Sequence, residues 1–169
     1  MKQTDNFKFD EANVMNELVY RNLSEDAKRQ ICAWKYGGEY DLYNLPTYEE
    51  MQVRQMGFMN PKSEKNYYGF WDESILVGFV NILEEKEEVF IGIGVNPDLC
   101  NKHYGQRMLL IAYEISKKLY PNKPLYLEVR TWNIRAVKCY QKAGFRIVGQ
   151  AYELTTGIGT GTFYRMIRE

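Results

Sequence analysis

The residues of this chain best suited to bind an anion lie between an apolar run and an amphipathic helical pattern. The run VFIGIGV (89–95) is apolar, Pro97 interrupts it, and a helical pattern begins near Tyr104. Backbone amides at the start of a helix lack partners within the helix, and the helix dipole adds positive potential there. Lys102 and Arg107 would add charge. The pattern indicates a phosphate site; the alternative is an ordinary strand-to-helix turn that binds nothing.

The strand that leads into this loop is interrupted by two glycines, Gly92 and Gly94. Glycine weakens the interior of a strand, so its presence indicates a bulge or the close approach of another backbone or a ligand. The glycines therefore predict that something lies against this strand just before the loop.

Hydrophobic periodicity and turn residues predict the elements that position the loop. Capping residues are expected at Ser24 and Thr47, and Gly144 is expected to end a helix in a left-handed conformation. The expected strands are 18–23, 66–71, 75–83, 89–95, 124–129, 145–154 and 162–168, and the expected helices are 25–34, a short one from about Thr47, one from Tyr104 to Pro121, and 133–143. The aromatic stretch 35–46 is expected to be a loop.

The order of these elements predicts an α/β fold. Short connections make the strands between 66 and 95 an antiparallel meander. The strands at 89–95 and 124–129 are joined through a helix, and such a right-handed crossover makes them parallel. We therefore expect a central mixed, mostly antiparallel sheet with one parallel strand pair, flanked by helices.

Composition narrows the class of protein. The 169 residues carry 22 basic and 22 acidic side chains, which predicts no nucleic-acid or anionic-membrane partner. The cysteines are Cys32, Cys100 and Cys139, and the only histidine is His103, so neither a metal site nor a disulfide framework is expected. Residues 1–17 show no signal-peptide pattern and are expected to form an extension before a domain at 18–169. These features favour a cytoplasmic protein.

The loop resembles the acyl-CoA pyrophosphate loop of the GCN5-related N-acetyltransferase (GNAT) superfamily, in which a strand ending in V-x-P precedes [Q/R]-x-x-G-x-[G/A]. Val95, Pro97 and Gly105 match this pattern, whereas Cys100 stands where glutamine or arginine is usual and His103 where glycine is usual. Asparagine and histidine tolerate positive φ better than most residues. Asn101 and His103 are therefore expected to hold a glycine-like backbone.

A second motif supports the same resemblance. The segment 127–145 is similar to the superfamily's second signature, and the matching residues are Asn133, Ala136, Tyr140, Gly144 and Phe145. The resemblance covers about residues 18–169. It implies a GNAT fold and a direct acetyl transfer from acetyl-CoA, without a metal, to an amine. Small relatives commonly dimerise, so it also admits a homodimer.

The resemblance also implies roles for single residues. Tyr140 would protonate the departing thiolate, which suits a phenol of pKa near 10 beside a thiol near 8.5. A strand amide near Val95 would hold the oxyanion. Cys139 has no base beside it in sequence and is expected to pack. The expected coenzyme-binding residues are Ile93, Val95, Cys100, Asn101, Lys102, His103, Tyr104, Gly105, Gln106, Arg107, Asn133 and Ala136.

The base and the acceptor site are less defined by sequence. Glu128 is a candidate base, Glu87 and Glu88 are others, and water relayed to backbone carbonyls is an alternative. The aromatic residues Trp34, Tyr36, Tyr40 and Tyr43 are expected to line the acceptor pocket, where ring faces would bind a cation.

The acceptor class stays open between three kinds of primary amine. These are aminoglycoside-like small molecules, polyamine-like small molecules, and a peptide or protein N-terminus. The alternative to an enzyme is a non-catalytic acyl-CoA-binding or regulatory module of the same fold. The glycine-rich segment 155–163 precedes a strand and not a helix, so it is no dinucleotide motif, and we expect a mobile loop beside the acceptor site.

Overall fold

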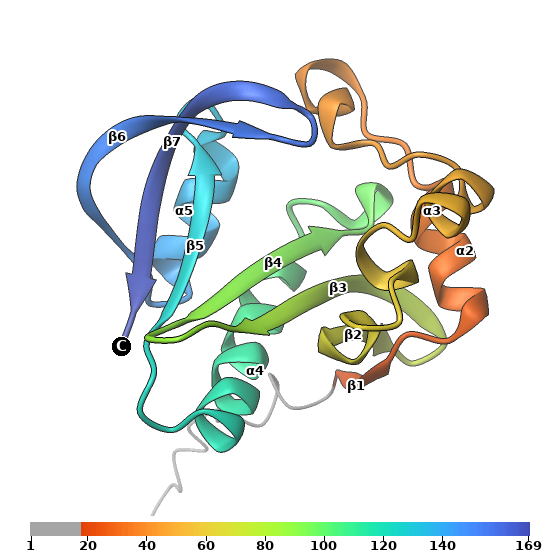
Figure 1. Cartoon of the computed structure of the whole chain (residues 1–169), viewed down its shortest axis with the longest axis horizontal. Helices are drawn as coiled ribbons and strands as arrows, with labels where there is room; N and C mark the ends of the chain where they lie inside the picture. Colours follow the sequence, from red (N-terminus) through yellow and green to blue (C-terminus); the bar gives the residue numbers. More distant parts are fainter. Residues whose placement is uncertain (1–17) are drawn as a thin grey trace, which may run out of the picture.

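The computed structural model describes residues 18–169, which form one mixed sheet with helices on both faces (Figure 1). The predicted extension at 1–17 lies outside the described residues. Seven strands of the described part follow the order β1-β2-β3-β4-β5-β7-β6. They are β1 (Val19–Asn22), β2 (Tyr67–Asp72), β3 (Ile75–Glu84), β4 (Val89–Val95), β5 (Leu125–Arg130), β6 (Arg146–Thr156) and β7 (Gly159–Arg168). No helix within this part of the chain is long and apolar enough to span a membrane.

The helices begin where the sequence places capping side chains. Ser24 accepts a hydrogen bond from the Ala27 amide, and Thr47 forms a reciprocal capping box with Glu50. Gly144 has a φ of +91°, as predicted for the end of a helix. The α-helices are α2 (Glu25–Ala33), α3 (Tyr48–Arg54), α4 (Tyr104–Leu119) and α5 (Ile134–Lys142), and the 3-10 helices are η1 (Gly38–Tyr43), η2 (Gly57–Met59), η3 (Glu64–Asn66) and η4 (Pro97–Leu99).

Two apolar cores hold the layers together. On one face of the sheet, Met108 and Leu109 of α4 pack with Ile91 and Leu127. On the other face, α2 and α3 form a separate cluster that includes Met51. In Figure 1, α2 and α3 lie beside β1–β3, at the end of the sheet away from β5–β7.

The parallel pair that the sequence predicted is present, and it is short. β4 pairs in parallel with β5 at Val89–Leu125 and Phe90–Tyr126, and α4 forms the crossover between them. Beyond these pairs the two strands diverge, as Figure 1 shows. The divergence opens the middle of the sheet next to the end of β4.

Two predictions of local structure were wrong. The segment 155–163 was expected to be a mobile loop, but β6 and β7 pair through it at Thr155–Thr160 and Thr156–Gly159. A two-residue turn joins the strands, and threonine favours a strand, so the segment forms a hairpin. The aromatic stretch 35–46 was expected to be a loop, and it contains the 3-10 helix η1.

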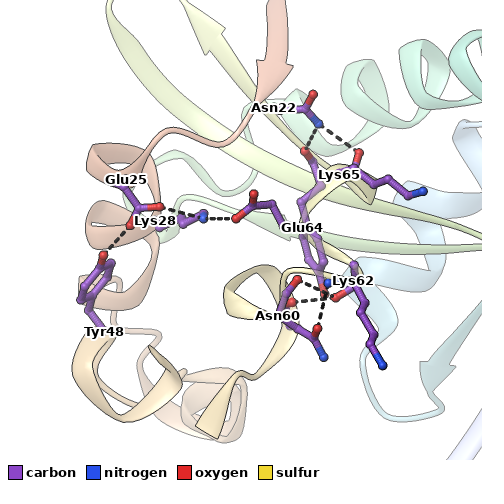
Figure 2. Close-up of polar contacts among 11 residues, drawn as sticks. Asn22, Glu25, Lys28, Tyr48, Asn60, Lys62, Glu64 and Lys65 are labelled. Atoms are coloured by element: carbon purple, nitrogen blue, oxygen red, sulfur yellow. Dashed lines mark hydrogen bonds and ion pairs between the residues drawn. The ribbon is translucent and has the colours of Figure 1, made fainter. Parts of the chain in front are cut away.

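A buried lysine ties the N-terminal helices together (Figure 2). Lys28 of α2 is 3% exposed, and its Nζ lies 2.9 Å from Glu25 Oε1 and 2.8 Å from Glu64 Oε2. The Tyr48 hydroxyl donates to the other oxygen of Glu25. The network therefore joins α2, the start of α3 and η3, and it offsets the cost of burying the ammonium group.

This network predicts an acid-sensitive contribution to stability. The hydrogen bond from Tyr48, and then that from Lys28, lowers the pKa of Glu25 below its ordinary value of 4.5. Since the folded-state pKa is depressed, the contribution is present above pH 4.5 and is lost as pH falls through the folded-state value. We expect Glu25→Gln to lower the free energy of unfolding at pH 7 by less than about 1 kcal/mol, because the carboxylate is largely exposed, and to flatten the acid dependence.

Urea unfolding at pH 7 and at about pH 3 checks this expectation. Glu87→Gln is the matched control, since Glu87 lies in the exposed turn between β3 and β4. Equal pH dependence of the wild type and the Glu25→Gln variant would contradict it.

Candidate active site

The open edge of β4 presents alternate peptide groups to the gap beside β5. The Asn96 amide donates to Val77 O at 2.8 Å, and Val95 is paired with Gly78. In an antiparallel ladder this pattern makes Val95–Gly78 a non-hydrogen-bonded pair, and such pairs recur at every second residue. Ile93 and Val95 therefore direct their N–H and C=O groups away from β3, toward the side that β5 leaves.

A cleft of about 700 Å³ occupies this gap. It extends from the start of α4 across the end of β4 to the outer face of β5. Most of the residues selected from sequence line it, namely Trp34, Tyr36, Tyr40, Tyr43, Ile93, Val95, Cys100, Asn101, His103, Tyr104, Gly105, Gln106, Glu128, Asn133, Ala136 and Tyr140. Lys102 and Arg107 belong to the same loop and helix start but do not line the cleft.

The loop before α4 has the backbone that the sequence predicted. Asn101 and His103 both have a φ of +64°, the left-handed conformation that glycine would adopt most readily. A Cβ atom added to Gly105 would lie 3.0 Å from the sulfur of Cys139, so α4 and α5 approach closely here. The Tyr104 hydroxyl donates to Asp72 at 2.5 Å and anchors the helix start to the end of β2.

Tyr140 lies on α5 beside the cleft. Burial raises the pKa of its phenol, with Cys139 and Tyr43 adding to the shift. The phenol is therefore a weaker acid than the ordinary value assumed from sequence, and it stays protonated at neutral pH, which a proton donor requires. Cys139 packs against the main core as expected, and burial raises the pKa of its thiol.

Asn133 holds the start of α5 and a second element at once. Its Oδ1 accepts a hydrogen bond from the Ala136 amide at 3.2 Å, and its Nδ2 donates to the Tyr43 hydroxyl at 3.3 Å. The side chain is 7% exposed. Asn133 therefore caps α5 and links it to η1 in addition to lining the cleft.

The candidate bases differ in their surroundings. Glu128 lies on β5 in the wall of the cleft, and its carboxylate accepts a hydrogen bond from the Tyr152 hydroxyl. Glu88 forms an ion pair with Arg165. Neither Glu88 nor Glu87 lines the cleft. Of the three glutamates, the structure thus brings only Glu128 to the candidate site.

The segment 36–43 spans the opening between the two halves of the sheet. Tyr40 and Tyr43 stack with Trp132 at ring-centroid distances of 5.7 and 6.2 Å, and the Arg135 guanidinium lies 4.0 Å from the centre of the Tyr40 ring. The Tyr36 hydroxyl donates to Val95 O at 2.6 Å. The ring face of Tyr40, expected to bind an acceptor cation, thus already holds a cation of the protein.

A model of the acetyltransferase (GNAT) family matches residues 29–145, well over half of the chain. The chain belongs to this family. The match extends from α2 through Phe145, so it includes the loop before α4, both diverging strands and Tyr140. No curated protein matches the sequence significantly.

Solved structures of GNAT acetyltransferases share the fold. A GNAT-family acetyltransferase from Bacillus anthracis has a TM-score of 0.71 at 17% identity, covering 90% of this chain and 94% of that one. A spermidine N-acetyltransferase from Vibrio cholerae, in complex with CoA and spermine, has a TM-score of 0.70 at 18% identity, covering 90% and 95%. AAC(6')-Ib in complex with ribostamycin and coenzyme A has a TM-score of 0.67 at 16% identity, covering 89% and 93%.

Sequence reasoning missed other polar and aromatic residues of this GNAT domain that lie at or beside the cleft. Arg130 lines the cleft at the end of β5, the Tyr152 hydroxyl of β6 donates a hydrogen bond to Glu128, and Trp132 stacks on η1. Strand alternation places Glu128 and Arg130 on the same face of β5, and this signal was readable from sequence. The pairing of Tyr152 with Glu128 depends on the register of β6 and β7, which sequence does not give.

Proposed function

We propose that the protein is an N-acetyltransferase that transfers an acetyl group directly from acetyl-CoA to a primary amine. The observation that carries the proposal is the divergence of β4 from β5, which leaves the peptide groups of Ile93 and Val95 facing a cleft that leads to the start of α4. A chain of amides can bind such an edge as an added strand would. The pantetheine arm of acetyl-CoA is such a chain.

The loop before α4 supports the same donor. The first amides of α4 point out of the helix start, and phosphate groups bind favourably there. Lys138 and Lys142 of α5 also line the cleft and would add positive charge near the phosphates. In this proposal Tyr36 releases the Val95 carbonyl, or shares it, when the pantetheine arm binds.

The reaction removes two protons from the acceptor nitrogen and supplies one to the CoA sulfur. The acceptor ammonium first loses a proton to water or to Glu128. The amine nitrogen then attacks the thioester carbonyl carbon, a C–N bond forms, and the oxyanion accepts hydrogen bonds from the N–H of Ile93 or Val95. As the C–S bond breaks, Tyr140 donates its proton to the departing thiolate of CoA. The nitrogen of the new amide then loses its second proton, which returns through water to the Tyr140 phenolate.

The acceptor in this proposal is a primary amine of a small molecule or of a peptide or protein N-terminus. Nine aromatic residues line the cleft, which suits an acceptor with apolar parts beside its amine, namely Trp34, Tyr36, Tyr40, Tyr43, Phe79, Phe90, Tyr104, Tyr140 and Phe163. Spermine and ribostamycin occur in two structures of the same fold, and at 16–18% identity that likeness concerns the fold.

A second candidate function is a non-catalytic acyl-CoA-binding module. It is favoured by the departures at Cys100 and His103 from the family's loop pattern. Steady release of CoA in the presence of any amine would exclude it.

Thermal unfolding with and without acetyl-CoA tests donor binding. A ligand at 100 times its dissociation constant stabilises the folded state by roughly 2.7 kcal/mol, which raises the melting temperature measurably. We expect acetyl-CoA and free CoA to stabilise the protein and ATP to have a much smaller effect. No shift at millimolar acetyl-CoA would contradict both candidate functions.

A further inference from the structure

We propose that the acceptor is a small zwitterionic amine, with a carboxylate beside its amino group, and that Arg130 binds this carboxylate. The inference rests on the proposed function and assigns a substrate class to the same cleft. The last residue of β5, Arg130, is a buried arginine in the wall of the cleft.

Arg130 is 7% exposed, and its guanidinium group has weak partners within the protein. Its Nη2 donates to Gly159 O at 3.3 Å, and the group lies 4.9 Å from the centre of the Phe163 ring. None of the ion pairs formed among residues 18–169 includes Arg130. A guanidinium has five N–H donors, and a buried cation without a counter-charge is unfavourable. An anionic ligand would supply the missing charge.

The geometry of β5 places a negative charge on the same wall. Glu128 precedes Arg130 by two residues, and the strand ladder places both on one face, opposite Arg165 and Phe163 of β7. They do not pair with each other, since the Glu128 carboxylate accepts from Tyr152 and Arg130 donates to Gly159. The wall therefore holds two separated charges of opposite sign, which match an amine and a carboxylate of one molecule.

The charges around the cleft disfavour a polycationic acceptor. Glu128 is the only carboxylate among the described residues that line it, whereas several basic residues do. On the acceptor side, Arg130 lies on β5 and the Arg135 guanidinium lies over the Tyr40 ring, while Lys138 and Lys142 lie further along α5. A polyamine or an aminoglycoside would need several carboxylates and would be repelled by Arg130. An acceptor with one amine and one carboxylate meets neither difficulty.

The test compares amino acids with their carboxamides as acceptors of the full-length wild-type protein. Each carboxamide keeps the amine and replaces the negative charge by a neutral group of similar size. Release of the CoA thiol is measured with acetyl-CoA as donor. Spermidine and a small amine that carries a phosphate group in place of the carboxylate are included as further acceptors. We expect kcat/KM for the best amino acid to exceed that for its carboxamide by about 10- to 100-fold, as for loss of a hydrogen bond to a charged group.

Variants of Arg130 test the assignment. Arg130→Met is expected to raise KM for the amino acid to that of the carboxamide, to leave kcat within about threefold, and to keep the acetyl-CoA shift in melting temperature. Arg130→Lys is expected to retain part of the preference. Arg146→Met is the matched control, because Arg146 is an exposed arginine of β6 that pairs with Glu169.

Each outcome decides between supporting and overturning the proposal. Equal or better rates with carboxamides or spermidine would overturn the proposed substrate class while leaving acetyl transfer intact. A preference for the amine that carries a phosphate would overturn the carboxylate and assign a phosphate group to Arg130. A preference that survives in Arg130→Met, or loss of the acetyl-CoA shift in that variant, would remove Arg130 from the acceptor site. Absence of transfer to any amine would contradict the proposed function as well. The wild-type comparison decides even if the variants do not fold.

Discussion

Tyr140→Phe is expected to lower kcat by about 100-fold or more, with acetyl-CoA affinity close to that of the wild type. Proton donation to a leaving group contributes typically 10²–10⁴-fold, and phenylalanine keeps the ring while removing the proton. Burial raises the pKa of Tyr140, so the phenol stays protonated above its ordinary value of 10. The wild-type kcat should therefore show no decline from Tyr140 ionisation below about pH 10.

Single-turnover and steady-state rates of CoA release measure the change, and calorimetric titration measures donor affinity. Tyr113→Phe is a suitable control, because this tyrosine of α4 donates to the Glu169 backbone carbonyl, away from the cleft. A Tyr140→Phe rate within about twofold of the wild type would remove Tyr140 from the mechanism. A large loss of acetyl-CoA affinity in the variant would instead assign the hydroxyl to donor binding.

Local signals were sufficient to predict the elements and their order. Ser24 and Thr47 cap helices as expected, because a capping side chain accepts a hydrogen bond from an amide only three residues further along the chain. The parallel pairing of β4 with β5 followed from the crossover rule. The left-handed backbone of Asn101 and His103 was likewise predictable from residue type.

Features that depend on distant contacts were not predictable. From its position on a helix, Lys28 would be expected to lie in solvent. It is buried instead, and its ammonium group donates to the carboxylate of Glu64, 36 residues away. The contact between Asn133 and Tyr43 joins residues 90 positions apart. Such contacts depend on how the two halves of the sheet meet, and periodicity within one segment carries no information on that.

The candidate site likewise divides into a part that local sequence predicts and a part that depends on distant contacts. The residues proposed to bind the donor belong to two local motifs, and the structure places nearly all of them around one cleft. The proposed acceptor side is assembled from η1, the turn after β5 and the β6–β7 hairpin, which meet only in the folded chain. The misassigned segment 155–163 belongs to this side, where its hairpin supplies the Gly159 carbonyl that holds Arg130.

His103→Val is expected to weaken acetyl-CoA binding by about tenfold. A β-branched residue at a φ of +64° is strained, and the left-handed conformation costs an L-residue roughly 1–2 kcal/mol. The loop would relax away from the geometry that directs its amides into the cleft, and 1.4 kcal/mol corresponds to a factor of ten in affinity. Calorimetric titration with acetyl-CoA measures the loss.

His103→Gly separates the backbone from the imidazole, since both variants lose the same ring. The His103 side chain makes no capping hydrogen bond to α4, so its removal alone is expected to cost little. Glycine adopts positive φ without strain, and we expect this variant to bind acetyl-CoA as tightly as the wild type. Equal losses in both variants would show that the imidazole itself contacts the donor. Wild-type affinity in both would mean that the loop backbone does not bind it, since only the valine distorts that backbone.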